Sequence, residues 1–182
     1  MQQVYAYADY ITINISSPNT PGLRELQHGE GLSSLLMLLK NKQAELEKLH
    51  HRYVPLAVKI APDLESEEII DIAERLLSAN IDAVIATNTT SSRPSSLVFE
   101  KLAQEQGGLS GQPVFELSTD ILKQLVAALD GKIPVIAAGG ISSADDAFEK
   151  MQAGASLVQI YTGFIYSGPQ LIHDCALRLK IN

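Results

Sequence analysis

Hydrophobic positions along the chain follow two alternating patterns. Short runs rich in Val, Ile and Ala predict strands, and longer segments with apolar residues at helical spacing predict helices. The expected strands cover residues 10–16, 55–61, 82–88, 133–140 and 156–162, and the expected helices cover residues 31–51, 66–79, 117–129, 144–153 and 168–179. Strands that alternate with helices pair in parallel through right-handed crossovers, so the pattern predicts one α/β domain.

Two of the expected helices begin with capping signals. Ser66 is followed by Glu67 and Glu68, and Ser143 precedes Asp145 and Asp146. A serine side chain accepts a hydrogen bond from a free N–H group at a helix start, and acidic residues in the first turn interact favourably with the helix dipole. We therefore expect these two serines to mark helix starts.

Polar residues gather on one face of the first two expected strands. In residues 10–16 Thr, Asn and Ser alternate with isoleucines, and in residues 55–61 Lys59 shares a face with Ala57 and Ala61. Inward polar groups near strand ends are needed at the catalytic end of a (β/α)8 barrel, whereas a doubly wound sheet usually has apolar residues on both faces. The pattern therefore favours the barrel over the doubly wound sheet.

The number of expected units is smaller than a complete barrel needs. A (β/α)8 barrel has eight strands and typically about 250 residues, whereas this chain of 182 residues has five expected strand–helix units. An open piece of a barrel leaves unpaired parallel edges, which favour association. The pattern predicts either a different architecture or the C-terminal part of a longer enzyme.

Composition narrows the class of protein. Hydrophobic residues make up 46% of the chain and charged residues 19%, as in a globular protein, and the net charge of -7 without a basic stripe argues against binding to nucleic acid. The single cysteine, Cys175, excludes an internal disulfide. There is no apolar run of about 18 residues and no signal-peptide pattern at the start. We therefore expect a cytoplasmic protein.

The stretch "NISSPNTPG", residues 14–22, directly follows the first expected strand. An ordinary turn needs only one or two polar turn formers. This stretch instead presents amide or hydroxyl groups at Asn14, Ser16, Ser17, Asn19 and Thr20. Planar amides suit a substrate with carbonyl and N–H groups, so we interpret the stretch as an active-site loop. A polar strand-to-helix loop made of turn formers is the alternative.

Lys59 lies in the middle of the apolar run "AVKIAP". Burying a lysine there is costly without an anionic partner or a function. One interpretation is an inward cation that stabilises a negatively charged ring or substrate. The alternative is that Lys59 reaches solvent from the strand end or pairs with Asp63.

Glycine turns follow two later strands, in "AAGGISS" (137–143) and "IYTG" (160–163). Paired glycines let backbone N–H groups approach an anion, and in barrels a phosphate commonly lies between the last two such loops. We therefore predict a phosphate site there, whereas "GGLSG" (107–111) alone is weak evidence of a ligand contact. No histidine pair has metal-ligand spacing, so no metal site is predicted.

A set of motifs occurs together and in a characteristic order: "NISSPNTPGLRELQ", "VKIAPD", "IATNTT", "GGLSG", "AAGGI" and "LVQIYTGFIY". Over essentially its whole length the chain resembles dihydroorotate dehydrogenases of the quinone-dependent class. The resemblance implies a (β/α)8 barrel that holds FMN at its C-terminal face. It also implies oxidation of dihydroorotate to orotate in pyrimidine biosynthesis, with a quinone as the electron acceptor.

The resemblance assigns roles to individual residues. Ser17 matches the catalytic base of the quinone-dependent class, which removes a proton from C5 of the substrate; the cytosolic class has a cysteine there. The positions that match substrate contacts are Asn14, Asn19, Asn88 and Thr89. The positions that match flavin contacts are Asn14, Lys59, Thr87, Gly111, Gly140, Tyr161 and Thr162, of which the last three would lie at the phosphate.

The resemblance also bears on what the chain contains. Residues 1–182 are expected to be the C-terminal part of the FMN-binding barrel domain, about its last five strand–helix units, without the family's N-terminal strands and membrane-docking segment. Intact members are expected at the cytoplasmic face of the membrane. Two alternatives stay open. One is a non-catalytic remnant that self-associates or binds phosphate ligands, and the other is an aldolase-like barrel with Lys59 as its Schiff-base lysine.

Overall fold

A computed structural model of the protein describes residues 1–20, 22–94, 97 and 103–180. Its parallel sheet contains the strands β1 (Ile11–Asn14), β2 (Leu56–Ile60), β3 (Ala83–Ala86), β4 (Val135–Ala138) and β5 (Leu157–Gln159). The helices are η1 (Tyr5–Tyr7), η2 (Leu23–Gln27), α1 (Gly29–His50), α2 (Ser66–Ser78), η3 (Gln112–Val114), α4 (Phe115–Leu129), α5 (Ala144–Gln152), α6 (Thr162–Ser167) and α7 (Pro169–Lys180).

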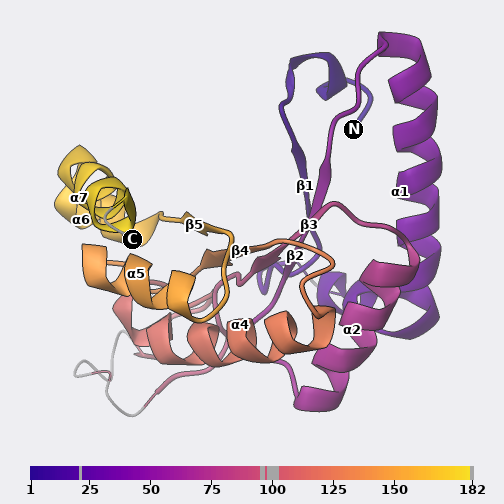
Figure 1. Ribbon diagram of the computed structural model, residues 1–182. Coiled ribbons are helices and arrows are strands. Elements are labelled where there is room, and N and C mark those ends of the chain that lie inside the picture. The colour runs from indigo at the N-terminus through magenta and orange to yellow at the C-terminus, as the bar shows by residue number, and fades with distance from the viewer. Residues whose placement is uncertain (21, 95–96, 98–102, 181–182) are drawn as a thin grey trace.

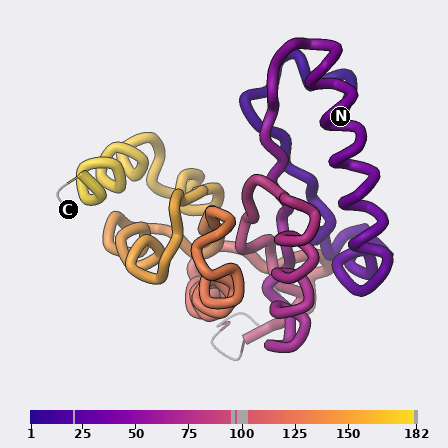
Figure 2. The backbone as a smooth tube through the Cα atoms, turned by 45° about the vertical axis from the view of Figure 1, so that its right-hand side comes forward, coloured from indigo at the N-terminus to yellow at the C-terminus, as the bar shows by residue number. Residues whose placement is uncertain are grey.

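The five strands are hydrogen-bonded in the order of the sequence, β1-β2-β3-β4-β5. Helices α2, α4 and α5 lie along one side of this sheet, and the opposite side is open (Figure 1). The two ends of the chain lie far apart in both views (Figures 1 and 2). A doubly wound sheet would reverse its strand order and carry helices on both faces. The arrangement is therefore an α/β partial (β/α)8 barrel, as the sequence predicts.

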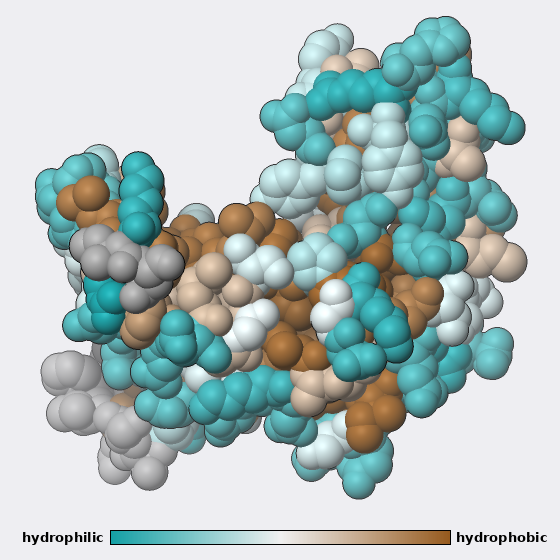
Figure 3. Space-filling view, in the orientation of Figure 1, coloured by the Kyte–Doolittle hydropathy of each residue, from teal (hydrophilic) through white to brown (hydrophobic). Residues whose placement is uncertain are grey.

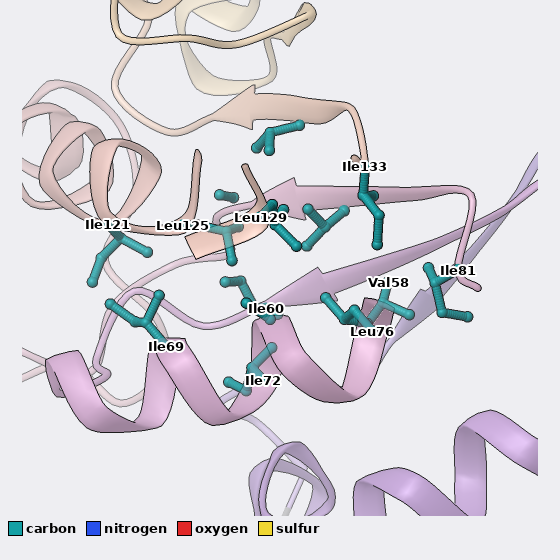
Figure 4. Packing of buried hydrophobic residues seen from close by; sticks show 14 of the residues in the cluster. Val58, Ile60, Ile69, Ile72, Leu76, Ile81, Ile121, Leu125, Leu129 and Ile133 are labelled. Atoms are coloured by element: carbon teal, nitrogen blue, oxygen red, sulfur yellow. The ribbon is translucent and has the colours of Figure 1, made fainter. Parts of the chain in front are cut away.

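The main core lies between the sheet and the helices. Val58 and Ile60 of β2 point toward Ile72 and Leu76 of α2, with Leu125 of α4 beside them (Figure 4). All five side chains are at most 1% exposed. Full burial of one such side chain contributes roughly 1.5–3 kcal/mol, so this layer fixes the orientation of the strands relative to the helices.

The inner face of the sheet carries a smaller apolar cluster. Ala57, Ile85 and Ala138 are buried together there, and Lys59 follows Ala57 on the same face. Figure 3 shows a broad hollow on this side of the molecule, with hydrophobic residues along its floor. The predicted alternation of faces in β2 is confirmed, because Val58 and Ile60 belong to the main core.

Both predicted helix starts are confirmed. Ser143 caps α5, and its hydroxyl accepts a hydrogen bond of 3.1 Å from the Asp146 backbone N–H. Helix α2 begins at Ser66, as expected, but its N-cap is Glu65, which forms a capping box with Glu68. A carboxylate reaches the free N–H groups as well as a hydroxyl does, and Ser66 instead donates to Gln124 at 2.8 Å.

The expected strands are longer than the observed ones, most clearly at the end of the chain. Residues 160–162 were expected to continue the last strand, but β5 ends at Gln159. Tyr161 is the N-cap of α6, a short helix that hydrophobic periodicity did not predict. The physical reason is its length of 6 residues, which is less than two turns and too short to show a helical period.

Asp82 supports the N-terminal ends of the strands. Its carboxylate accepts hydrogen bonds from the Leu56 backbone N–H at 2.8 Å, from Gln43 at 3.2 Å and from the Tyr53 hydroxyl. Burial raises the pKa of Asp82, but these hydrogen bonds and the charge of Lys40 outweigh burial and hold the pKa below its ordinary value. The charged carboxylate therefore stabilises the fold.

Replacing Asp82 with asparagine is expected to lower the free energy of unfolding at pH 7 by about 1–3 kcal/mol, because donors lose a charged acceptor. A carboxyl group with a lowered folded-state pKa stabilises the fold above its unfolded pKa of about 3.9 and loses that effect as the pH falls through the folded-state pKa. Urea denaturation from pH 7 to pH 3 should therefore show a weaker pH dependence in the variant. Asp9→Asn is the control, because the Asp9 side chain is 97% exposed.

Candidate active site

A cavity of about 660 Å³ opens at the carboxyl ends of β2 to β5. Its wall contains Lys59 near the end of β2 and three segments that follow later strands, residues 87–89, 138–142 and 159–163. Residues 110–114, which precede α4, close another side. The carboxyl ends of barrel strands are where active sites are built, and the volume is within the range of about 300–1,000 Å³ found for small-molecule sites.

The turn after β4 depends on its two glycines. Gly139 and Gly140 have φ angles of 122° and 78°, in the region that disfavours residues with a Cβ atom. A Cβ atom on Gly140 would lie 2.6 Å from the Phe115 backbone nitrogen. The turn therefore contacts the first turn of α4 directly, and its own backbone faces the cavity without side chains in between.

Lys59 is a half-buried cation in the cavity wall. Within the described part of the chain its ammonium group makes no ion pair or hydrogen bond, and burial lowers the pKa of Lys59. The alternative that Lys59 pairs with Asp63 is wrong, because the partner of Asp63 is Arg24, at 2.8 Å. The cation is therefore available to an anionic or electron-rich ligand in the cavity.

Amide groups from two strands meet beside the cavity. The Asn88 side-chain N–H group donates to Asn14 Oδ1 at 3.1 Å and to Ser16 Oγ at 3.0 Å. Asn88 lines the cavity. Ser17 and Asn19 lie in the adjacent loop outside its lining, where Ser17 Oγ accepts a hydrogen bond of 3.3 Å from the Asn19 backbone N–H. The structure thus joins the loop after β1 to the cavity through Asn14 and Asn88.

Arg24 connects three strand-to-helix loops. Its guanidinium group donates to the Ser16 carbonyl at 3.1 Å, to the Asp63 carboxylate at 2.8 Å and to the Thr89 carbonyl at 3.0 Å. Asp63 also accepts from the Ser91 backbone N–H at 3.0 Å. Burial raises the pKa of Asp63, but these hydrogen bonds and the Arg24 charge outweigh burial and leave its pKa below the ordinary value. Arg24 and Asp63 hold the polar loops together.

Replacing Arg24 with methionine is expected to release the contact between the loops after β1 and β3. The buried side of Asp63 loses its charged donor, which costs about 1–3 kcal/mol in the free energy of unfolding. The Ser91 amide proton, which bonds to Asp63, should exchange with solvent faster. Native-state hydrogen exchange checks this, with the exposed pair Arg178–Asp145 supplying the control variant Arg178→Met. Unchanged exchange at Ser91 would contradict the connecting role of Arg24.

Comparison with known proteins decides the family. The family model for dihydroorotate dehydrogenase matches residues 1–181. The chain belongs to the dihydroorotate dehydrogenase family. A relative from Enterobacter sp. (strain 638), named dihydroorotate dehydrogenase (quinone), is 60% identical over 174 residues, which cover 96% of this chain and 52% of the relative. A relative of the same name from Shewanella frigidimarina is 57% identical and covers 97% of this chain and 52% of its own length.

Solved structures agree with this membership. DHODH from Eimeria tenella, crystallised with ferulenol, superposes with a TM-score of 0.89 at 40% identity and covers 98% of this chain and 51% of that chain. The ligand-free form of the Eimeria enzyme has the same TM-score and identity. The chain therefore spans about half the length of the relatives it matches. That this half is the C-terminal one stays a prediction.

The residues that the family resemblance assigned fall into two groups in the structure. Those in the cavity wall are Lys59, Thr87, Asn88, Thr89, Gly111, Gly140, Tyr161 and Thr162. Asn14 contacts this group through Asn88, and Ser17 and Asn19 lie in the neighbouring loop. The pairing of Arg24 with Asp63 was not predicted, although the two residues lie in the quoted motifs "NISSPNTPGLRELQ" and "VKIAPD". Nothing in the spacing of the two motifs indicated that they pair.

In the described residues, no group of three or more His, Cys, Asp or Glu side chains is arranged to hold a metal ion. None of the helices in that part of the chain combines the length and hydropathy needed to cross a membrane.

Proposed function

We propose that this chain provides the flavin-binding part of a quinone-dependent dihydroorotate dehydrogenase, which oxidises (S)-dihydroorotate to orotate in pyrimidine biosynthesis. The observation that carries the proposal is the cavity at the carboxyl ends of the strands, whose wall contains an unpaired half-buried cation, amide groups and a glycine turn. Family membership supports the same reaction, since both bacterial relatives carry that name.

The cavity has the features that FMN requires. The glycine turn at Gly139 and Gly140 exposes backbone to the cavity because neither residue has a side chain, and such turns bind phosphate. Lys59 would place a positive charge beside the flavin ring, and Thr87 and Gly111 line the space near it. When bound, FMN supplies a two-electron acceptor for the oxidation of dihydroorotate.

The polar loop would bind and deprotonate the substrate. Asn14, Asn19, Asn88 and Thr89 provide amide and hydroxyl groups for the carboxylate and ring amides of dihydroorotate. Ser17 would take the proton from C5, but a serine is a weak base by itself and needs a desolvated site with a relay for the proton. The Arg24–Asp63 contacts keep this loop near Asn88, which is a condition for such positioning.

A quinone is proposed as the electron acceptor because both bacterial relatives are named dihydroorotate dehydrogenase (quinone). Intact members would act at the cytoplasmic face of the membrane, where their quinone is dissolved.

A second candidate, self-association of a non-catalytic chain, is favoured by the open sheet. Within the described residues β1 pairs only with β2 and β5 only with β4, so both edges are free. Near β5, Leu157, Ile165 and Tyr166 are 61%, 67% and 86% exposed. Free edges with apolar neighbours favour association. Size-exclusion chromatography tests it, and a clean monomer would count against this candidate. Membership in the dihydroorotate dehydrogenase family gives no support to the aldolase alternative.

The first test of the proposed function is the visible spectrum of the purified chain after incubation with FMN and desalting. We expect a retained flavin absorption band. Lys59→Met is the comparison variant, because it removes the cation beside the ring and should weaken retention. Complete loss of flavin on desalting from the unmodified chain would contradict the proposed FMN site.

A further inference from the structure

Lys150 is a second lysine that the proposed function does not use. It lies on α5, and its side chain is fully buried, with 0% exposure. Its Nζ atom donates hydrogen bonds to three oxygens, Phe115 O at 3.1 Å, Ser118 Oγ at 2.7 Å and Thr119 Oγ1 at 2.6 Å. These acceptors belong to the first turns of α4, so Lys150 joins α5 to the start of α4.

The geometry fits the charged form of Lys150. An ammonium group has three N–H donors and a neutral amine has two, so the three acceptors match the ammonium. Burial lowers the pKa of Lys150 to about 8. The carboxylates of Glu149, Glu116, Asp146 and Asp120 act in the opposite direction and raise this pKa, but by less than burial lowers it. The three hydrogen-bond acceptors are uncharged. A buried cation is costly, and the Phe115 ring, whose centroid lies 4.5 Å from Nζ, offsets part of this cost together with those carboxylates.

The hydrogen bonds of α4 do not require this cation. The Thr119 hydroxyl already donates to the Phe115 carbonyl at 2.7 Å, and the Ser118 hydroxyl has the Phe115 and Gly139 carbonyls as acceptors at 3.0 and 3.1 Å. An apolar side chain of similar length would leave both hydroxyls hydrogen-bonded. The hydrogen bonds of α4 therefore do not by themselves require a positive charge at this position.

Lys150 lies directly behind the glycine turn of the cavity. Its ammonium group bonds to Ser118 Oγ at 2.7 Å, and that oxygen bonds to the Gly139 carbonyl at 3.1 Å. On the other side of the turn, Gly139 and Gly140 form part of the cavity wall. An anion bound in the cavity beyond the turn would therefore lie on the far side of the turn from this buried positive charge.

We propose that Lys150 is a positioning residue for the phosphate group of the ligand, because it places a buried positive charge behind the Gly139–Gly140 turn, to which it is linked through Ser118. The proposal rests on the proposed FMN site. It assigns the phosphate affinity of the cavity partly to a residue that never touches the ligand.

The test compares FMN with riboflavin, which lacks the phosphate, by flavin fluorescence titration of the full chain. A unit charge about 10 Å from an anion, at an effective dielectric constant of about 20, changes affinity roughly tenfold. Lys150→Met is expected to weaken FMN binding roughly tenfold and riboflavin binding less than about twofold. Lys123→Met is the matched control, because it removes an exposed lysine from α4 and should leave both affinities unchanged.

The outcomes separate this inference from the proposed function. If Lys150→Met binds FMN as tightly as the unmodified chain, or weakens both ligands equally, the role of Lys150 is overturned while the FMN site stands. If the unmodified chain does not prefer FMN to riboflavin, the proposed phosphate site is overturned and the inference with it. Should Lys150→Met fail to fold, Lys150→Gln removes the same charge, keeps two N–H donors and gives the same comparison.

Discussion

Replacing Gly140 with alanine is expected to remove flavin binding and to lower the free energy of unfolding by several kcal/mol. The φ angle of 78° would strain any residue with a Cβ atom, at a cost of about 1–2 kcal/mol. The added Cβ atom would also lie 2.6 Å from the Phe115 backbone nitrogen. Because the obstacle is helix backbone, α4 has to move, and overpacking of this kind costs a further 1–3 kcal/mol or so. Urea denaturation and FMN titration measure both effects.

Gly131 provides the matched control for this substitution. It has a similar φ angle of 70°, but a Cβ atom there would meet nothing within 4 Å. Gly131→Ala therefore carries the backbone strain without the collision, and it should cost only about 1–2 kcal/mol and leave FMN binding unchanged. Equal losses in the two variants would show that contact between the turn and α4 is not what shapes the cavity.

Alternation within strands favoured the barrel architecture and predicted the orientation of Lys59. Period-2 patterning is a local property, and it placed Val58 and Ile60 in the core and Lys59 on the opposite face. Strand-to-helix alternation likewise predicted the parallel sheet, because crossover connections leave few other topologies. The ends of strands were predicted less well, since residues 160–162 were expected to continue the last strand but β5 ends at Gln159.

Partners from distant parts of the chain could not be predicted from the pattern. Asp63 is 4 residues from Lys59 and 39 residues from Arg24, yet it pairs with Arg24. Lys150 occupies an ordinary helical position in the sequence, and its side chain is buried where it reaches the first turns of α4. In each case the determining contact forms only when loops or helices from different units meet. The family resemblance found the cavity residues, but it gave no information on these supporting contacts.

These supporting contacts have a common consequence for the site. Arg24 and Asp63 hold the loops after β1, β2 and β3 together, and Ser118, which accepts a hydrogen bond from Lys150, links α4 to the turn after β4. The residues proposed to bind substrate belong to the first set of loops, and Gly140, which is proposed to bind phosphate, belongs to the turn after β4. Perturbing that turn should therefore weaken phosphate binding more than substrate binding.

Replacing Ser17 with alanine is expected to reduce turnover by about 10²–10⁴, the usual contribution of a general base. The measurement needs a protein with the remaining half of the barrel, for example a chimera that adds the corresponding residues of the Enterobacter relative. Orotate formation in that chimera should show a lower kcat with little change in KM, because the proton transfer is made only in the transition state. The fold should be unaffected, since Ser17 Oγ makes only an exposed hydrogen bond of 3.3 Å to the Asn19 backbone.

Ser34→Ala is the control for Ser17→Ala, because Ser34 is an exposed serine on α1, away from the cavity. The pH dependence of kcat gives a second readout. A serine that passes its proton to a relay should make turnover rise with pH, and that rise should disappear in Ser17→Ala if residual turnover uses water as the base. If kcat in the variant equals that of the unmodified chimera, Ser17 is not the base. The amide groups around Asn14 and Asn88 would then bind a substrate that another residue deprotonates.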